Sequence, residues 1–158
     1  SEALVPVLED RISFEAGLGA WQLRSFPESG SAGQVAQGSA ADGSSYVELQ
    51  PTGGTVWIER SYTLQAGRAY NVTLGVQARA LAGQGTLLKG LMNAAPSASP
   101  ALSEVGAVPS AWTRQLTPLT VRTDAQGRFW VMIGVRAAAG GTFGLDAVEV
   151  VVLDADSD

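Results

Sequence analysis

The sequence lacks both cysteine and histidine. Without cysteine there is no disulfide framework, no thiolate nucleophile and no zinc–cysteine site. Without histidine there is no serine–histidine–aspartate triad, no histidine general base and no histidine metal ligand. Any metal that binds is therefore held by oxygen atoms, which favours calcium or magnesium.

Charged residues and long apolar runs are also scarce. Charged side chains make up 16% of the chain, and its nine arginines and single lysine are scattered along it. A nucleic-acid-binding protein usually shows a basic stripe, which this sequence does not have. No apolar run approaches the ~20 residues of a membrane span. We expect neither a nucleic-acid partner nor a membrane segment.

What is present fits one folded domain. The chain has 158 residues, of which 46% are hydrophobic, and single cores typically span ~100–200 residues. We expect residues 1–153 to form this domain and the acidic residues 154–158 to form a tail or linker.

Apolar and polar residues alternate with a period of two in many short stretches, the clearest being Ala69–Ala80 and Phe129–Arg136. This alternation is typical of half-buried antiparallel strands. Further strands are expected at Trp21–Arg24, Gly33–Gln37, Tyr46–Gln50, Val56–Leu64, Thr86–Met92, Thr113–Thr123 and Leu145–Leu153. Residues 95–109, rich in alanine, serine and proline, are expected to form a long surface loop. The pattern predicts an all-β fold, a two-sheet antiparallel β-sandwich of the jelly-roll kind.

Several short motifs follow one another in a recognisable order. Ile12-Ser13-Phe14-Glu15 precedes a glycine-rich turn and Trp21, Leu64–Tyr70 leads into a long alternating strand, and Leu145–Val150 closes the chain. This order resembles the carbohydrate-binding modules of families four, nine and twenty-two, which belong to the galactose-binding-like fold. The sequence departs from the family at Gly75, where those modules often carry an aromatic residue.

The resemblance implies a structural calcium site. In the similar modules, the glutamate of the first motif and the aspartate of the last strand bind calcium, and these positions are Glu15 and Asp146 here. The turn around Asp42 and Gly43 would supply part of the remaining oxygen shell. The alternative is that both carboxylates are solvated acids at strand ends.

A sugar-binding face needs exposed aromatic rings beside planar polar side chains. Strand alternation places several such residues opposite the core positions of their strands, and we expect them to line one concave sheet: Trp57, Gln77, Arg79, Trp130 and Arg136. Trp21 and Trp112 are expected to pack in the core.

These observations predict a non-catalytic carbohydrate-binding module of an exported bacterial protein, with a polysaccharide or oligosaccharide as its ligand. It would act outside the cell or at the cell surface, beside other domains of a larger secreted protein. The acids on strand faces, Glu48, Glu59 and Glu149, show no spacing that pairs them as in a glycosidase. The alternative is a structural or interaction jelly-roll module of a surface or secreted assembly, in which Trp57, Trp130 and Met132 would contact protein rather than sugar.

Overall fold

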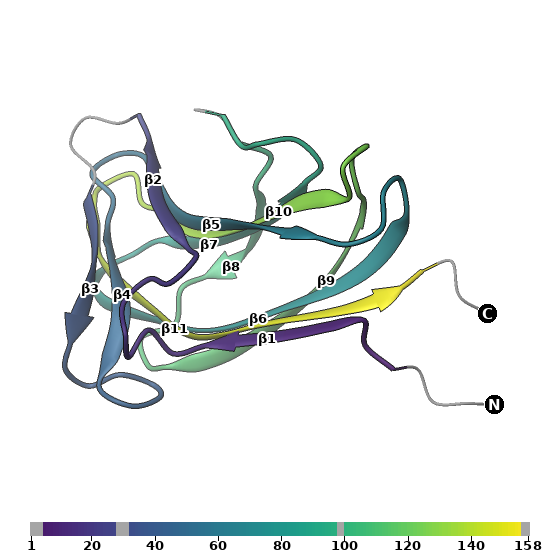
Figure 1. Ribbon diagram of the computed structural model, residues 1–158. Coiled ribbons are helices and arrows are strands. Elements are labelled where there is room, and N and C mark those ends of the chain that lie inside the picture. Colours follow the sequence, from purple (N-terminus) through teal and green to yellow (C-terminus); the bar gives the residue numbers. More distant parts are fainter. Residues whose placement is uncertain (1–4, 28–31, 98–99, 156–158) are drawn as a thin grey trace.

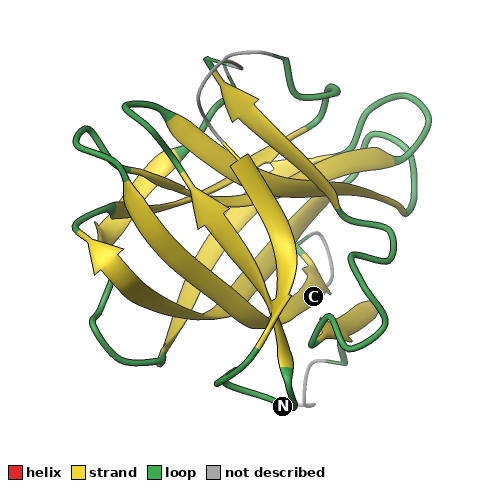
Figure 2. Cartoon of the chain, turned by 90° about the vertical axis from the view of Figure 1, so that its left-hand side faces the viewer, coloured by secondary structure: helices red, strands yellow, loops and turns green. Residues whose placement is uncertain are grey.

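The computed structural model describes residues 5–27, 32–97 and 100–155. Within them the chain forms two antiparallel sheets packed face to face (Figure 1), and Figure 2 shows strands and loops only. Sheet A contains β1 (Leu8–Ile12), β3 (Ala32–Gln37), β4 (Ser45–Gln50), β6 (Ala69–Gly83), β9 (Thr113–Arg122) and β11 (Gly141–Asp154). Sheet B contains β2 (Gln22–Phe26), β5 (Thr55–Thr63), β7 (Thr86–Met92), β8 (Ser103–Ala107) and β10 (Arg128–Arg136). The predicted two-sheet sandwich is confirmed. The described residues form no helix that is long and apolar enough to cross a membrane.

Strand β11 organises sheet A, whose order is β3-β4-β11-β6-β9. The first half of β11 pairs with β4, and its second half pairs with β1. The first and last strands, β1 and β11, are therefore neighbours, and β1 begins on the same side of the molecule as β11 ends (Figure 1). Sheet B has the order β2-β5-β10-β7-β8.

The core lies between the two sheets and confirms the alternation read from the sequence. Val72, Leu74 and Val76 of β6 and Val131 and Ile133 of β10 are at most 1% exposed. Burying one such side chain completely contributes roughly 1.5–3 kcal/mol. The alternating residues of these strands face away from the core, so each sheet has one outer surface on which a site can be built.

The predicted loop at 95–109 is wrong in its second half, because β8 runs through it at the edge of sheet B. Its residues pair with β7, with Glu104 opposite Leu88. The strand is exposed or half-buried throughout. An edge strand with no fully buried face leaves no alternation of apolar residues in the sequence, which is why the pattern did not reveal it.

Strand β1 was also not predicted, because a charged residue interrupts its apolar face. Leu8, Asp10 and Ile12 share the half-buried side of the strand. The Asp10 carboxylate accepts a hydrogen bond from the Tyr62 hydroxyl at 2.7 Å and from the Arg60 guanidinium at 3.1 Å. These bonds join β1 of sheet A to β5 of sheet B and satisfy an acid at a position where an apolar residue was expected.

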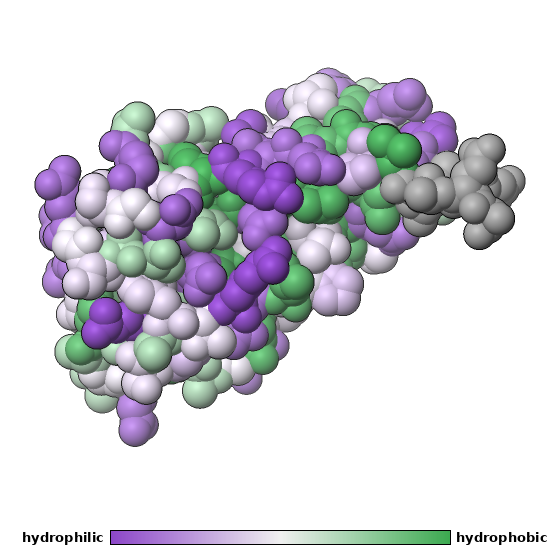
Figure 3. Space-filling model, turned by 90° about the horizontal axis from the view of Figure 1, so that it is seen from below, coloured by the Kyte–Doolittle hydropathy of each residue, from purple (hydrophilic) through white to green (hydrophobic). Residues whose placement is uncertain are grey.

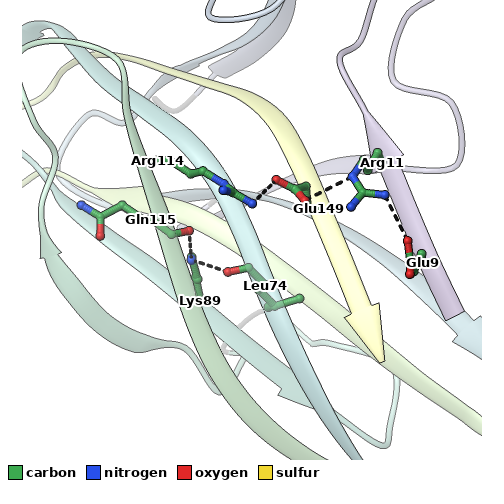
Figure 4. A network of polar contacts seen from close by, with 7 residues as sticks. All are labelled: Glu9, Arg11, Leu74, Lys89, Arg114, Gln115 and Glu149. Carbon is green, nitrogen blue, oxygen red and sulfur yellow. Dashed lines mark hydrogen bonds and ion pairs between the residues drawn. The ribbon is translucent and has the colours of Figure 1, made fainter. Parts of the chain in front are cut away.

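The only lysine of the chain, Lys89, extends into the interior of the sandwich (Figure 4). It stands opposite the core residue Ile133 and is 1% exposed. Its Nζ donates to the carbonyls of Leu74 and Gln115 at 2.8 and 2.9 Å and to Thr117 Oγ1 at 2.9 Å. Burial lowers the pKa of the Lys89 amine to about 8. The side chain thus fastens β7 of sheet B to β6 and β9 of sheet A.

The domain extends slightly past the predicted boundary at residue 153. Asp154 ends β11 opposite Tyr70 and forms an ion pair with Arg68 at 2.6 Å. The Ala155 amide donates to the carbonyl of Ala69 at 3.1 Å. Residues 154 and 155 are therefore part of the folded unit, and residues 156–158 of the predicted tail lie outside the described residues.

Candidate functional site

The five residues predicted to line one concave sheet fall on two different sheets. Trp57, Trp130 and Arg136 belong to β5 and β10 of sheet B, whereas Gln77 and Arg79 belong to β6 of sheet A. The hydrophobic core separates the two groups. The prediction of a single face is wrong, because alternation tells which residues point outward but not which sheet a strand joins.

On sheet B, Trp57 is not the exposed platform that strand parity suggested, since it is only 1% exposed. Its indole Nε1 donates to Glu59 Oε1 at 2.8 Å, and Arg24 Nε lies 3.2 Å from the other oxygen of this carboxylate. The Ala101 carbonyl, from the connection between β7 and β8, fills the space that a Cβ at Gly90 would need. The described parts of this connection rise above sheet B on the side away from sheet A (Figure 1). The middle of this outer face is therefore covered by the chain itself.

Trp130 remains the accessible aromatic ring that was predicted for sheet B. It lies on β10 between Ser61 of β5 and Met92 of β7, and it is half-buried. The guanidinium of Arg128 lies 5.4 Å from the centroid of the indole ring. An aromatic surface beside a cation and a hydroxyl has the composition that a sugar ring requires.

Arg136 stands at the other end of the same strand, ~20 Å from Trp130 by the rise of a β-strand. It forms an ion pair with Glu104 of β8. It also lines a pocket of about 760 Å³ at one end of the sandwich, together with Gln84 of the β6–β7 turn and Ser110 of the loop before β9. The pocket has the size of a small-ligand site, but buried residues separate it from Trp130.

The outer face of sheet A brings Gln77 and Arg79 beside residues of other strands. Pairing across β4, β11 and β6 places Glu48, Gly144 and Arg79 in one row. Glu48 Oε1 accepts a hydrogen bond from Gln50 at 3.2 Å. Seen from this side, polar side chains extend across the middle of the face (Figure 3).

Trp112 packs on this same outer face, so its expected place in the core is wrong. The side of Gly144 away from the core holds the Trp112 ring, with Cη2 only 2.6 Å from where a Cβ would stand. Its ring lies edge-on to Tyr46, with centroids 5.6 Å apart, and its Nε1 donates to the carbonyl of Ser39 at 2.8 Å. Trp21 is 3% exposed, which confirms the same prediction for that residue. No sequence pattern marked Trp112 as outward-facing, because it precedes its strand.

Gly75 lies in the middle of this face, at the position where the sequence resemblance would lead us to expect an aromatic residue. A Cβ at Gly75 would come within 2.9 Å of Leu116, whose side chain covers the glycine. Beside it, Glu149 accepts from Arg11 at 3.2 Å and from Arg114 at 2.7 Å (Figure 4). These pairs link β1, β11 and β9, although exposed ion pairs each contribute little to stability.

The two expected calcium ligands lie on either side of one turn, residues 41–45. Glu15 accepts hydrogen bonds from the backbone amides of Ser44 and Ser45 at 2.9 and 2.8 Å, which lower the pKa of its carboxyl. Asp146 is fully buried and accepts from the amide of Asp42 at 2.9 Å. Burial raises the pKa of Asp146 above its ordinary value. The two carboxylates thus tie segments near both ends of the chain to this turn through hydrogen bonds to its backbone amides.

These residues fit a calcium ion in part. Glu15 and Asp146 offer the hard oxygen atoms that calcium prefers, and Asp42 lies close to both. Among the described residues, however, no three acidic side chains gather closely enough to hold a metal. Calcium takes six to eight oxygen ligands, so backbone carbonyls and water would have to supply most of them. The role of Glu15 and Asp146 as calcium ligands stays a prediction.

Glu59 lies apart from the other two acids on strand faces. Glu59 lies on sheet B, where Trp57 and Arg24 engage its carboxylate. Glu48 and Glu149 lie on sheet A, on the other side of the core. A glycosidase places two carboxyl groups across one cleft, ~5 or ~6.5–9.5 Å apart. Glu59 therefore has no partner of this kind in Glu48 or Glu149.

Comparison with known proteins supports the fold. No family model and no curated protein matches the sequence. The xylan-binding domain of Paenibacillus barcinonensis, a family 22 carbohydrate-binding module, matches at a TM-score of 0.62 and 15% identity, over 98% of this chain and 99% of that one. A family 61 module in complex with β-1,4-galactotriose matches at 0.55 and 19% identity, over 90% and 94%. The K3 cleaved adhesin domain of Lys-gingipain from Porphyromonas gingivalis matches at 0.60 and 13%, over 93% and 99%.

The chain therefore has the jelly-roll β-sandwich fold of carbohydrate-binding modules, as the sequence resemblance implied. The same fold occurs in an adhesin domain. At these levels of identity the likeness extends to the fold, and the site must be argued from the residues of this chain.

Proposed function

We propose that this chain is a non-catalytic saccharide-binding module of an exported bacterial protein, and that Trp130 is its stacking platform. The observation that carries the proposal is the half-buried indole of Trp130 on the outer face of sheet B, beside the guanidinium of Arg128. Most of the similar structures named above are carbohydrate-binding modules, which supports a saccharide as the ligand. The exported location rests on the same similarity.

The chemistry of this face suits a sugar ring. The C–H groups of a sugar present an apolar surface that packs on an indole, and the neighbouring hydroxyls accept hydrogen bonds from Arg128 or exchange them with Ser61. Trp57 is buried and hydrogen-bonded to Glu59, so it does not contact the sugar itself. A single partly exposed ring leaves much of the sugar in water, so we expect modest affinity. Arg136 contributes only if the ligand is long enough to reach its pocket.

A titration of the intrinsic tryptophan fluorescence against xylan, β-1,4-galactan and mixed-linkage glucan tests the proposal. We expect a saturable change with at least one glycan, and its loss in Trp130→Ala. The matched control is Phe26→Leu, because Phe26 is an exposed ring on the same outer face, 46% accessible, near the other end of the sheet. Urea unfolding of each variant shows whether the fold is kept. A flat response to all three glycans in the wild type contradicts the proposal.

The alternative is a module that binds protein through the same residue, as the adhesin likeness suggests. In that case Trp130 belongs to an apolar contact. Size-exclusion chromatography separates the two functions, because self-association that Trp130→Ala abolishes, together with a flat glycan titration, favours the protein interface.

A further inference from the structure

Arg79 has no partner that explains its position. Its Nε is the only buried side-chain nitrogen or oxygen of the described residues that lacks a hydrogen bond. Leaving such a donor unsatisfied costs free energy, and the cost is higher for a charged group. Native structures rarely keep a group of this kind without a reason.

The other arginines are accounted for within the described part of the chain. Seven form ion pairs with carboxylates, and they are Arg11, Arg24, Arg60, Arg68, Arg114, Arg128 and Arg136. Arg122 donates to the carbonyl of Gly67 at 2.7 Å. Among the described residues, no carboxylate lies within ion-pair distance of Arg79. Its positive charge is available to an external group.

The surroundings of Arg79 supply the other elements of a saccharide site. Gln77 lies two residues away on the same face of β6. Trp112 covers Gly144, the neighbour of Arg79 in the sheet, and is half-buried, so part of its indole meets solvent. The hydrogen bond from Trp112 to the carbonyl of Ser39 fixes the orientation of this ring. A stationary ring beside a free guanidinium and an amide is pre-organised for a flat, polar ligand.

We propose that the outer face of sheet A binds a saccharide that carries a carboxylate, that is, a uronate, through Arg79 and Trp112. The carboxylate accepts two hydrogen bonds from the guanidinium, which turns outward to present Nε and one terminal nitrogen. This geometry is the preferred one for arginine and a carboxylate, and it satisfies the donor that is otherwise orphaned. The sugar ring packs on Trp112, and Gln77 takes a ring hydroxyl. This site is separate from that of Trp130 and does not depend on it.

Isothermal titration with oligogalacturonate and with β-1,4-galactotriose, a neutral ligand of similar length, tests this inference. We expect the acidic ligand to bind at least ten-fold more tightly to the sheet A face at low salt, and to weaken as salt is added. Arg79→Gln should lose this preference while Trp130→Ala retains it. Arg122→Gln is the matched control, because it removes an equal charge from the neighbouring edge strand β9.

Three outcomes overturn the inference. They are equal binding of the neutral and acidic saccharides, unchanged binding of oligogalacturonate by Arg79→Gln, and binding of a hexaglutamate peptide as tight as that of the oligogalacturonate. The last result would assign the face to an acidic protein partner. Because the neutral glycans and Trp130→Ala test the site on sheet B, failure of one site is distinguishable from failure of the other.

Discussion

The buried Lys89 makes the stability of the protein depend on pH in an unusual direction. Its amine has a pKa of about 8 in the folded chain against an ordinary value of 10.5. Between these two values the unfolded chain keeps the proton and the folded chain releases it. The unfolded state then binds more protons, so the free energy of unfolding rises as the pH rises. Most proteins are most stable between about pH 5 and pH 8.

The size of this effect follows from the difference of about 2.5 units in the pKa of Lys89. Each unit corresponds to about 1.36 kcal/mol, which gives about 3 kcal/mol in total, most of it between pH 7 and pH 10. Above pH 10 the trend reverses, because burial and the hydrogen bond to Asp10 raise the pKa of Tyr62. The unfolded chain then loses the tyrosine proton first, and stability falls. We expect maximal stability near pH 10.

Few other side chains titrate in this pH range, because the chain has no histidine or cysteine and Lys89 is its only lysine. Urea unfolding, followed by tryptophan fluorescence at pH 7, 8, 9 and 10, should show the free energy of unfolding rising by about 2–3 kcal/mol. In Lys89→Met the rise should disappear, since this variant keeps every other titratable side chain. If wild type and Lys89→Met show parallel curves over this range, the reasoning about the buried amine is refuted.

Three further predictions concern single contacts. Gly144→Ala places a Cβ 2.6 Å from the Trp112 ring, so we expect about 1–3 kcal/mol of destabilisation in urea unfolding; an unchanged midpoint would contradict the close packing. If Glu15 and Asp146 bind calcium, an ion concentration of 100 times Kd should stabilise the wild type by about 2.7 kcal/mol. Thermal unfolding with calcium and with a chelator measures this, and Asp146→Asn should not respond. Hydrogen bonds from backbone amides and from the Arg128 side chain lower the pKa of Asp124 below its ordinary value of 3.8. The carboxylate therefore stabilises the fold above pH 3.8, and this stabilisation is lost as the pH falls through the lowered pKa. Acid unfolding of Asp124→Asn should not show this loss of stability.

The strands that carry the core could be predicted from the sequence because burial on one face imposes a period of two. The stretches 69–80 and 129–136 were assigned correctly for this reason. The edge strand β8 has no buried face, so its residues carry no such signal. In β1, Asp10 stands where an apolar residue would complete the pattern, and only its bonds to Arg60 and Tyr62 explain its presence.

The candidate site was harder to predict, since it depends on contacts between distant segments. Alternation correctly turned Trp57 away from the core, but the sequence gives no sign that other parts of the chain cover it. Alternation along β6 also correctly placed Arg79 on the outside. It could not show that β6 joins sheet A, because that depends on its pairing with β9 and β11. The interior position of Lys89 was missed, because a lone lysine between apolar residues is usually assumed to reach solvent.

The outer faces of the two sheets differ in which of their outward side chains are buried by other parts of the chain. On sheet B, Trp57 and Met132 are at most 1% exposed, and the rings that reach solvent are those of Trp130 and Phe26, towards opposite ends of the sheet. On sheet A, the ring of Trp112 packs over Gly144, in the row that also holds Glu48 and Arg79. An unpaired cation beside a fixed ring favours a charged, flat ligand, whereas the indole of Trp130, whose neighbour Arg128 is already paired with Asp124, favours a neutral one. If both sites bind, their ligands should therefore differ in charge, and neither should displace the other.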